Sequence, residues 1–309
     1  MNTTTTAQTI EALTREHLNR GGLLFGQCVT AVGWIGGTVP SDCINTGIIE
    51  IPMTDVAGPG FAVGAALMGK RPIFVVRYQG FMWLNASTIV NYAAKSKEIW
   101  GIPCPVFIRA IGAEGQGVGH TASGGLHSLF MHTPGIRVEA PMLPSEYRAV
   151  WQRFLKGDDP VYCSEHRSSF SLTDLSLCKY KSANPRITII AIGAARINAE
   201  EATKTDLARL CDLFPIVTLK PFFSPMDLLK SLHDTKLGLV IDCGYEIAGA
   251  ARSIAYDLAQ ATSAKMYALG LEDRSSGASK QSENITPSAE KIRQTINDIL
   301  KGHIHATST

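Results

Sequence analysis

The sequence lacks several features that mark broad classes of protein. No apolar run reaches the roughly 18 residues of a membrane-spanning helix, and the start MNTTTTAQT has no apolar signal-peptide core. Only 18% of the residues are charged, the net charge is +2, and lysine and arginine form no run. We therefore expect a cytoplasmic chain that binds neither a membrane nor nucleic acid.

The cysteines lack any recognisable spacing. All seven are dispersed along the chain, and no two of them form a C-x-x-C pair. An odd, scattered set favours reduced thiols, most of which behave as small core side chains. We expect no metal to be bound by this chain.

Short apolar runs do alternate with helical patterns along the whole chain. Their apolarity is continuous, which is typical of strands buried on both faces of a parallel sheet. The pattern predicts an α/β fold made of two open α/β domains with mostly parallel sheets. The expected strands are 72–76, 105–112, 186–193, 215–219, 237–242 and 265–271.

A chain of 309 residues is long enough for two domains. A polar stretch separates the two α/β sets, so we expect a first domain over 10–167, a linker over 168–183 and a second domain over 184–302. One helix of the first domain should begin with Ser145 as its N-cap, because an apolar face with helical spacing follows it.

Residues 117–132, GVGHTASGGLHSLFMH, are the densest stretch in candidate chemistry. Its histidines, His120, His127 and His132, lie seven and five residues apart, whereas a zinc-binding helix carries H-x-x-x-H or similar spacing. His127 and His132 would point about 140° apart on a helix. A loop followed by a helix is favoured over a metal site. The stretch follows an expected strand, where open α/β sheets place ligands.

A second glycine-rich segment, MTDVAGPGFAVGAALMG, runs over residues 53–69 from a loop into a helix of small residues. Asp55 lies just before this helix. The residues alone leave two interpretations open, a helix N-cap and a functional carboxylate.

Taken in order, these segments resemble β subunits of thiamine-diphosphate-dependent 2-oxo acid dehydrogenase E1 components. IPMTDVAGPGFAVGAALMGKRPIF resembles the family's I-S-E triplet, its G-x-A-V-G-A-A helix and its G-x-R-P turn. RYQGFMWLNASTIVNYAAK, HTPGIRVEAPMLPSEYRAV and GDDPVYCSEH resemble further family motifs. The similarity covers about residues 45–300. It implies a pyrimidine-binding domain followed by a transketolase C-terminal-like domain.

The resemblance also implies roles for single residues. Asp55 stands where the family has the glutamate that hydrogen-bonds N1′ of the cofactor's aminopyrimidine. Tyr78 falls where the family stacks an aromatic ring on that pyrimidine, and Phe81 is a weaker candidate beside it. Arg77 replaces the family's usual glutamine. Asp55 is therefore one candidate catalytic residue. His120 is the other, because of its place in the loop described next.

The family carries a histidine over the reactive carbon of the cofactor, and Ala122 occupies that position here. His120 lies two residues earlier and would take the same place if the loop is rearranged. His127 is expected on the next helix, near the pocket or a subunit interface. His132 matches a histidine of the family and is expected to be structural or on the pocket wall.

The resemblance further implies a partner chain. The family holds the diphosphate and Mg²⁺ of the cofactor through a G-D-G…N motif on a separate domain, and this sequence contains no G-D-G. An α subunit should therefore supply that site in an α₂β₂ heterotetramer. The enzyme would cleave the C–C bond next to the keto group of a 2-oxo acid or ketose. It would transfer the two-carbon or acyl unit to a lipoyl or other carrier thiol.

Two alternatives remain open at this point. The chain would otherwise be the C-terminal half of a split transketolase with an aldose acceptor, or a catalytically silent subunit that stabilises its partner. Asp55 and Ala122, the two departures from the family pattern, motivate the second alternative.

Overall fold

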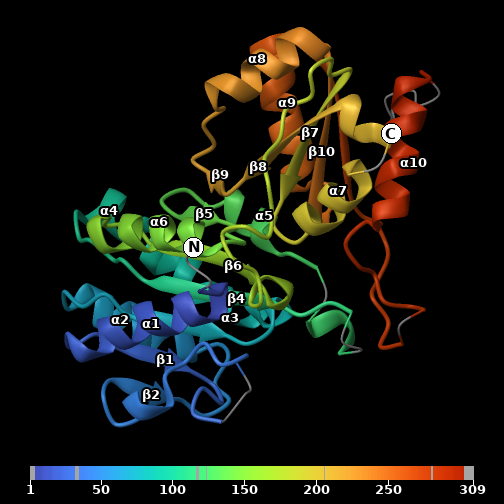
Figure 1. Ribbon diagram of the computed structural model, residues 1–309. Helices are drawn as coiled ribbons and strands as arrows, with labels where there is room; N and C mark the ends of the chain where they lie inside the picture. Colours follow the sequence, from blue (N-terminus) through green and yellow to red (C-terminus); the bar gives the residue numbers. More distant parts are fainter. Residues whose placement is uncertain are drawn as a thin grey trace.

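The computed structural model describes residues 4–31, 35–115, 118–122, 124–204, 206–279 and 281–302. The strands form two sheets, and helices pack against both (Figure 1). The predicted α/β fold with mostly parallel sheets is confirmed. None of the helices in the described ranges is long and apolar enough to cross a membrane.

The first sheet has the strand order β2-β1-β3-β4-β6-β5-β9, and every pairing in it is parallel except that of β5 with β9. Every residue of β3 and β4 is buried, as the continuous apolar runs predicted. The strands are β1 (Leu24–Gly26), β2 (Ile48–Glu50), β3 (Ile73–Val76), β4 (Phe107–Gly112), β5 (Arg137–Glu139), β6 (Val161–His166) and β9 (Thr218–Lys220).

Two apolar clusters flank this sheet. On one face, Phe107 meets Trp151 and Phe154 at ring-centroid distances of 5.1 and 5.0 Å, which joins α6 to the sheet. On the other face, the rings of Phe130 and Tyr162 stack at 4.1 Å. The helices are α1 (Thr6–Asn19), α2 (Gly58–Leu67), α3 (Met82–Thr88), the π-helix η3 (Ile89–Ala93), α4 (Ala94–Trp100), α5 (His127–Met131) and α6 (Pro144–Lys156).

The second sheet has four parallel strands in the order β11-β10-β7-β8. On one face of this sheet, Ile190, Phe214 and Val240 belong to the cluster that also holds Phe74 and Phe130, so one core connects the two sheets. Residues on its other face, among them Ile189 and Leu239, form a separate cluster. The elements are β7 (Ile187–Ile192), α7 (Ala195–Thr203), β8 (Cys211–Ile216), α8 (Met226–Thr235), β10 (Leu237–Tyr245), α9 (Ala250–Thr262), β11 (Lys265–Leu271) and α10 (Ala289–Leu300).

Short 3₁₀ helices connect several of these elements. They are η1 (Ser41–Cys43), η2 (Gln79–Phe81), η4 (Gly119–Thr121), η5 (Arg167–Ser169) and η6 (Asp206–Arg209).

The expected strand 215–219 is wrong as a single element. β8 ends at Ile216, and β9 begins at Thr218 and pairs with β5 of the first sheet. In Figure 1, β9 lies beside β5, below the rest of the second sheet. An apolar run indicates a strand but not the sheet that the strand joins. As a result, a strand from within the predicted second domain completes the first sheet.

The expected N-cap of α6 is also wrong. The helix begins at Pro144, with the extended residue Leu143 before it, so Ser145 lies inside the first turn. The carboxylate of Glu146 accepts a hydrogen bond from the backbone N–H of Leu143 at 3.2 Å. Pro144 suits the first helical position because it has no N–H to satisfy there.

Candidate active site

Asp55 lies between β2 and α2, where the chain turns after the carboxyl end of the strand. Its Oδ1 atom accepts hydrogen bonds from the side-chain amides of Gln27 and Asn85, both at 3.1 Å. The N-cap of α2 is Ala57, and no side chain caps the helix start. Asp55 is therefore not a helix cap, and its carboxylate is held by two neutral donors.

Gln27 follows β1, and Asn85 lies on α3, so two separate elements fix the same carboxylate. The amide of Asn85 also donates to the backbone carbonyl of Phe81 at 2.9 Å, which fixes its orientation. Asp55, Phe81 and Asn85 line a small cavity of about 60 Å³. Two of the predicted site residues, Asp55 and Phe81, are thus brought together.

Tyr78 follows β3 and lies beside Phe81, with 6.0 Å between the ring centroids. The guanidinium carbons of Arg77 and Arg167 lie 5.1 and 5.7 Å from the centroid of Tyr78, a distance at which cations are attracted to an aromatic face. The carboxyl edge of the sheet therefore presents an aromatic pair with positive charge next to it.

The loop that the sequence singled out packs directly on this aromatic segment. A Cβ atom added to Gly80 of η2 would lie 2.7 Å from the Cα atom of Thr121 in η4, so only glycine permits this approach. Ala122 is buried, and its carbonyl accepts from the N–H of Ala113 at 2.9 Å. The backbone of His120 belongs to η4, and its side chain lies outside the described residues.

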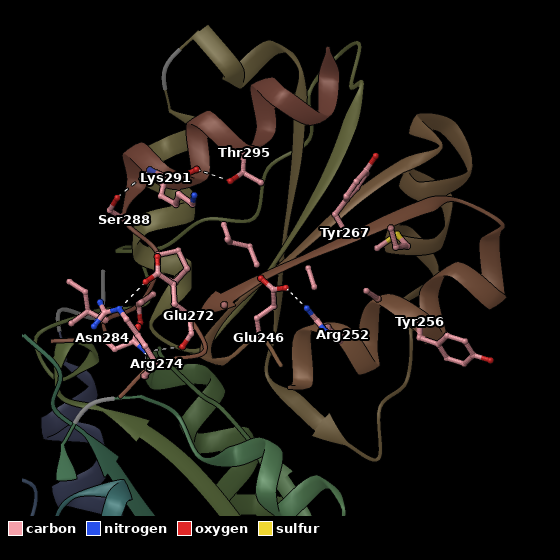
Figure 2. A pocket seen from close by; sticks show the side chains of 18 of the residues that line it. Glu246, Arg252, Tyr256, Tyr267, Glu272, Arg274, Asn284, Ser288, Lys291 and Thr295 are labelled. Atoms are coloured by element: carbon pink, nitrogen blue, oxygen red, sulfur yellow. Dashed lines mark hydrogen bonds and ion pairs between the residues drawn. The ribbon is translucent and has the colours of Figure 1, made fainter. Parts of the chain in front are cut away.

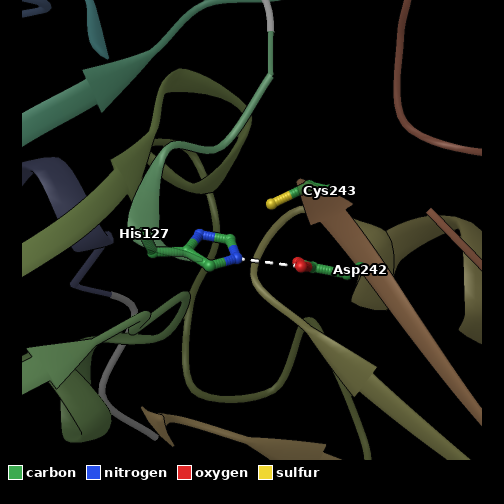
Figure 3. Close-up of side chains that lie close together, drawn as sticks. All are labelled: His127, Asp242 and Cys243. Atoms are coloured by element: carbon green, nitrogen blue, oxygen red, sulfur yellow. Dashed lines mark hydrogen bonds and ion pairs between the residues drawn. The ribbon is translucent and has the colours of Figure 1, made fainter. Parts of the chain in front are cut away.

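The other two histidines of the stretch have contrasting surroundings. His127, the first residue of α5, has no exposed surface, and its ring contacts Ser164. It also contacts Asp242 (Figure 3). His132 is exposed at the C-terminal end of α5. The structure therefore does not place the side chains of His127 and His132 in one site.

The sequence did not indicate a further buried histidine, which lies at the carboxyl edge of the first sheet. Burial lowers the pKa of His166, at the end of β6, to about 4, so its imidazole is neutral at physiological pH. Its Nε2 atom lies 3.8 Å from the carboxylate of Glu114. Glu114 in turn accepts a hydrogen bond from the hydroxyl of Thr286, which ties the loop after β4 to the C-terminal region. The motif GDDPVYCSEH marked this position without indicating its burial.

A larger cavity, of about 970 Å³, lies at the β11 edge of the second sheet, between α9 and α10 (Figure 2). None of the predicted site residues lines it. Its charged groups are mostly paired: Arg252 with Glu246 and Arg274 with Glu272, each at 2.8 Å. The converging polar and aromatic groups described above are therefore the better candidate for the chemistry.

Comparisons with known proteins identify the family of the chain. Residues 16–171 match the transketolase pyrimidine-binding domain. The chain is 30% identical to the β subunit of acetoin:2,6-dichlorophenolindophenol oxidoreductase of Cupriavidus necator, over 63% of this chain and 62% of that subunit. It is 26% identical to the pyruvate dehydrogenase E1 component subunit β of Rickettsia conorii, over 67% of this chain and 68% of that subunit.

A solved structure shares the fold over nearly the whole chain. It is described as a split gene transketolase, inactive beta4 tetramer, and it matches with a TM-score of 0.72 at 18% identity over 96% of both chains. Fold, site and sequence match together define the class: the chain belongs to the transketolase pyrimidine-binding domain family. Within that family it is an E1 β-like or transketolase-like subunit.

Proposed function

We propose that the chain is the β-type subunit of a thiamine-diphosphate-dependent enzyme that cleaves the C–C bond beside a keto group. The substrate is a 2-oxo acid or a ketose, and the acyl or two-carbon unit passes to a lipoyl or other carrier thiol. The observation that carries this proposal is the fixed carboxylate of Asp55 beside Phe81 and Tyr78, in a chain that belongs to this family.

The donor set suits the aminopyrimidine of the cofactor. Both amides donate to Oδ1 of Asp55, so Oδ2 keeps its acceptor sites for a ligand. When bound, thiamine diphosphate supplies a nucleophilic carbon and an electron sink for C–C cleavage. Asp55 would accept the hydrogen bond from N1′, and Tyr78 and Phe81 would contact the flat faces of the ring. Asp55 is one methylene shorter than the family's glutamate, about 1.5 Å.

The charges around Tyr78 favour an anionic substrate. Arg77 and Arg167 both lie within 6 Å of its ring centroid. Guanidinium groups bind carboxylate and phosphate well because their donors match the spacing of two oxygens. A 2-oxo acid carries the first group and a ketose phosphate the second.

A partner chain would cover the helices next to Asp55. Helices α2 and α3 and the π-helix η3 contact one another, and together they expose large apolar side chains that a monomer seldom leaves in water. This apolar face consists of Val56, Phe61, Leu67, Met68, Trp83, Leu84 and Tyr92. Val56 is adjacent to Asp55 and Asn85 lies on α3, so the partner would complete the site. An α subunit in an α₂β₂ assembly, holding the diphosphate and Mg²⁺, is the expected occupant.

The test is to combine the chain with an α-type chain that carries the G-D-G…N motif. Thiamine diphosphate and Mg²⁺ should then produce a circular dichroism signal that neither chain gives alone. Asp55→Asn should lose that signal, whereas Asp234→Asn, an exposed carboxylate on α8, should keep it. An unchanged signal in Asp55→Asn would contradict the proposed role of Asp55.

Product analysis separates the remaining possibilities. Release of CO₂ from 2-oxo acids supports the E1-type reaction, and transfer from a ketose phosphate to an aldose supports the split transketolase. If the assembled pair binds the cofactor and turns over neither substrate class, the chain is a silent stabilising subunit.

A further inference from the structure

We propose that His127, Asp242 and Cys243 form a site for a four-coordinate divalent metal ion, best matched by Zn²⁺, at the junction of the two sheets. This site is separate from the one at Asp55 and does not depend on the proposed function. His127 comes from α5, and the other two residues are consecutive in β10.

The three side chains offer one ligand atom each, and these atoms all lie within 4.8 Å of one another. Figure 3 shows the imidazole of His127 pointing at the carboxylate of Asp242, with the sulfur of Cys243 close by. All three residues are buried. Nitrogen, sulfur and carboxylate oxygen are the ligands that Zn²⁺ takes in proteins.

The carboxylate supplies a second observation. Oδ2 of Asp242 lies 2.9 Å from Nε2 of His127, but Oδ1 is buried without a hydrogen-bond partner among the described residues. A buried polar atom without a partner costs about 1–3 kcal/mol. A metal ion would give Oδ1 a partner, and bidentate binding by Asp242 would complete four donor atoms.

The imidazole is oriented as metal-binding histidines usually are. Its Nδ1 atom lies 3.2 Å from Oγ of Ser164, and that hydroxyl oxygen also accepts from the amide of Gln79 at 2.9 Å. If Nδ1–H donates to Ser164, Nε2 keeps its lone pair for the metal, which is the outer-shell arrangement common at zinc sites.

The charges balance when the ion is bound. Cys243 is buried, and because an apolar environment disfavours a thiolate, the thiol keeps its proton without a cation. Binding of M²⁺ would form an M–S bond and release that proton to solvent. Thiolate and carboxylate would then carry two negative charges, which the ion neutralises, and the imidazole stays neutral.

Only a small shift separates the present contact of His127 with Asp242 from metal ligation by both side chains. Metal–ligand bonds of about 2.1 Å at tetrahedral angles set nitrogen and oxygen about 3.4 Å apart, so the His127–Asp242 pair would open by about 0.5 Å. Glycines beside the cluster let its side chains come close. A Cβ atom at Gly244 would lie 3.0 Å from Oδ2 of Asp242, and one at Gly193 would lie 2.9 Å from Sγ of Cys243.

The test uses the full-length chain alone, without partner or thiamine diphosphate. Chain purified from cells grown with Zn²⁺ should contain about one zinc per chain by mass spectrometry. Chain made with Co²⁺ instead should show a thiolate-to-cobalt charge-transfer band. Cys243→Ser should abolish the band, and Cys163→Ser, another buried cysteine, should keep it. Near-ultraviolet circular dichroism checks that each variant is folded.

Cys243→Asp guards against a misfolded serine variant. It keeps an anionic ligand, so it should retain zinc and lose only the cobalt band. The proposal is overturned if folded wild-type chain holds only trace zinc, or if the cobalt band persists in Cys243→Ser. The cluster would then be a buried hydrogen-bond network without a metal. Failure of the cofactor test at Asp55 would leave this result unaffected.

Discussion

Asp55 follows a strand of the first sheet, and Asp242 lies in a strand of the second sheet. The two carboxylates differ in how far they are exposed to solvent. Asp55 is partly exposed, follows β2, and is held by the neutral amides of Gln27 and Asn85. Asp242 is fully buried near the end of β10 and faces the ring of His127. An open carboxylate with neutral donors keeps its charge available to a cofactor or substrate, whereas an enclosed one can meet only its protein partners and the small ion proposed above.

Their neighbourhoods differ in the same way. The helices around Asp55 expose the apolar face that begins with Val56 and Phe61, while Asp242, from the second sheet, is buried against His127 of α5. The surroundings of Asp55 are therefore open to solvent in the single chain, and those of Asp242 are closed to it. Mutations should distinguish the two sites. Changes at Asp55 should lower activity and leave stability unchanged, whereas changes at His127, the partner of Asp242, should lower stability and leave activity unchanged.

The largest effect is expected for Asp55→Ala. Turnover of the assembled enzyme should fall by at least about 10²-fold. The carboxylate would accept the hydrogen bond from N1′, and side chains that assist proton transfer contribute that much in enzymes. Urea unfolding of the chain alone should change by less than about 1 kcal/mol, since the side chain is partly exposed. Asp234→Ala is the matched control. Full activity in Asp55→Ala would remove the residue from the chemistry.

His127→Ala should produce the opposite result. It leaves the buried carboxylate of Asp242 without the imidazole that faces it, and removal of one partner of a buried ionisable pair typically costs about 3–5 kcal/mol. Urea denaturation of the chain alone measures this loss. His132→Ala, at the exposed end of the same helix, should change stability by less than about 0.5 kcal/mol. Equal effects of the two substitutions would mean that the buried contacts of His127 contribute nothing to the free energy of unfolding.

Phe61→Glu should weaken binding of the partner chain. Phe61 is 56% exposed on α2, and a charge at the centre of a buried apolar contact should cost at least about 2 kcal/mol, or about 30-fold in Kd. Calorimetric titration with the α-type chain measures this. Phe223→Glu, at an exposed position before α8, is the control. If only Phe223→Glu weakened binding, the partner would sit on the second sheet's side.

Asn85→Ala and Gln27→Ala test how the carboxylate of Asp55 is positioned. Each removes one amide donor and leaves the other, so turnover should fall by about 10-fold, within the range for a hydrogen bond to a charged group. The pH profile of kcat should shift while the KM of the substrate changes little. The double variant should lose more than either single one. A change confined to KM would instead place these amides in substrate binding.

The smallest effect concerns His166. Its folded pKa of about 4 lies below the usual value of 6.5, so the unfolded chain binds more protons between these two values. Stability should therefore be lost as pH falls from 6.5 toward 4, by about 1 kcal/mol between pH 7 and 5.5. His166→Gln should lose correspondingly less in urea unfolding at the two pH values. An identical loss in both proteins would assign the pH dependence elsewhere.

Local signals in the sequence predicted the open site better than the closed one. Asp55, Tyr78 and Phe81 lie within short motifs that resemble those of the E1 β family, and this resemblance proposed a shared site. The contact of His127 with Asp242 joins residues 115 positions apart. Spacing within residues 117–132 could not reveal it, because the partner arrives from another sheet.

The same limit applies to secondary structure. Continuous apolar runs located β4 and β7, whose residues are all buried, because strands buried on both faces leave few polar positions. The run over 215–219 covers parts of two strands that belong to different sheets. Pairing in a sheet is decided by long-range packing, which a local pattern does not contain.

The pairing of β9 with β5 also bears on how the chain can be divided for experiments. Lys220, at the end of β9, donates a hydrogen bond to the carbonyl of Met131 at 2.9 Å, so this strand is held to the first sheet by side chain as well as backbone. A fragment that stops before residue 184 would leave the outer edge of β5 with unpaired backbone groups, which favours aggregation. A soluble recombinant fragment of the first sheet should therefore carry β9, either by extension beyond Lys220 or as an added peptide.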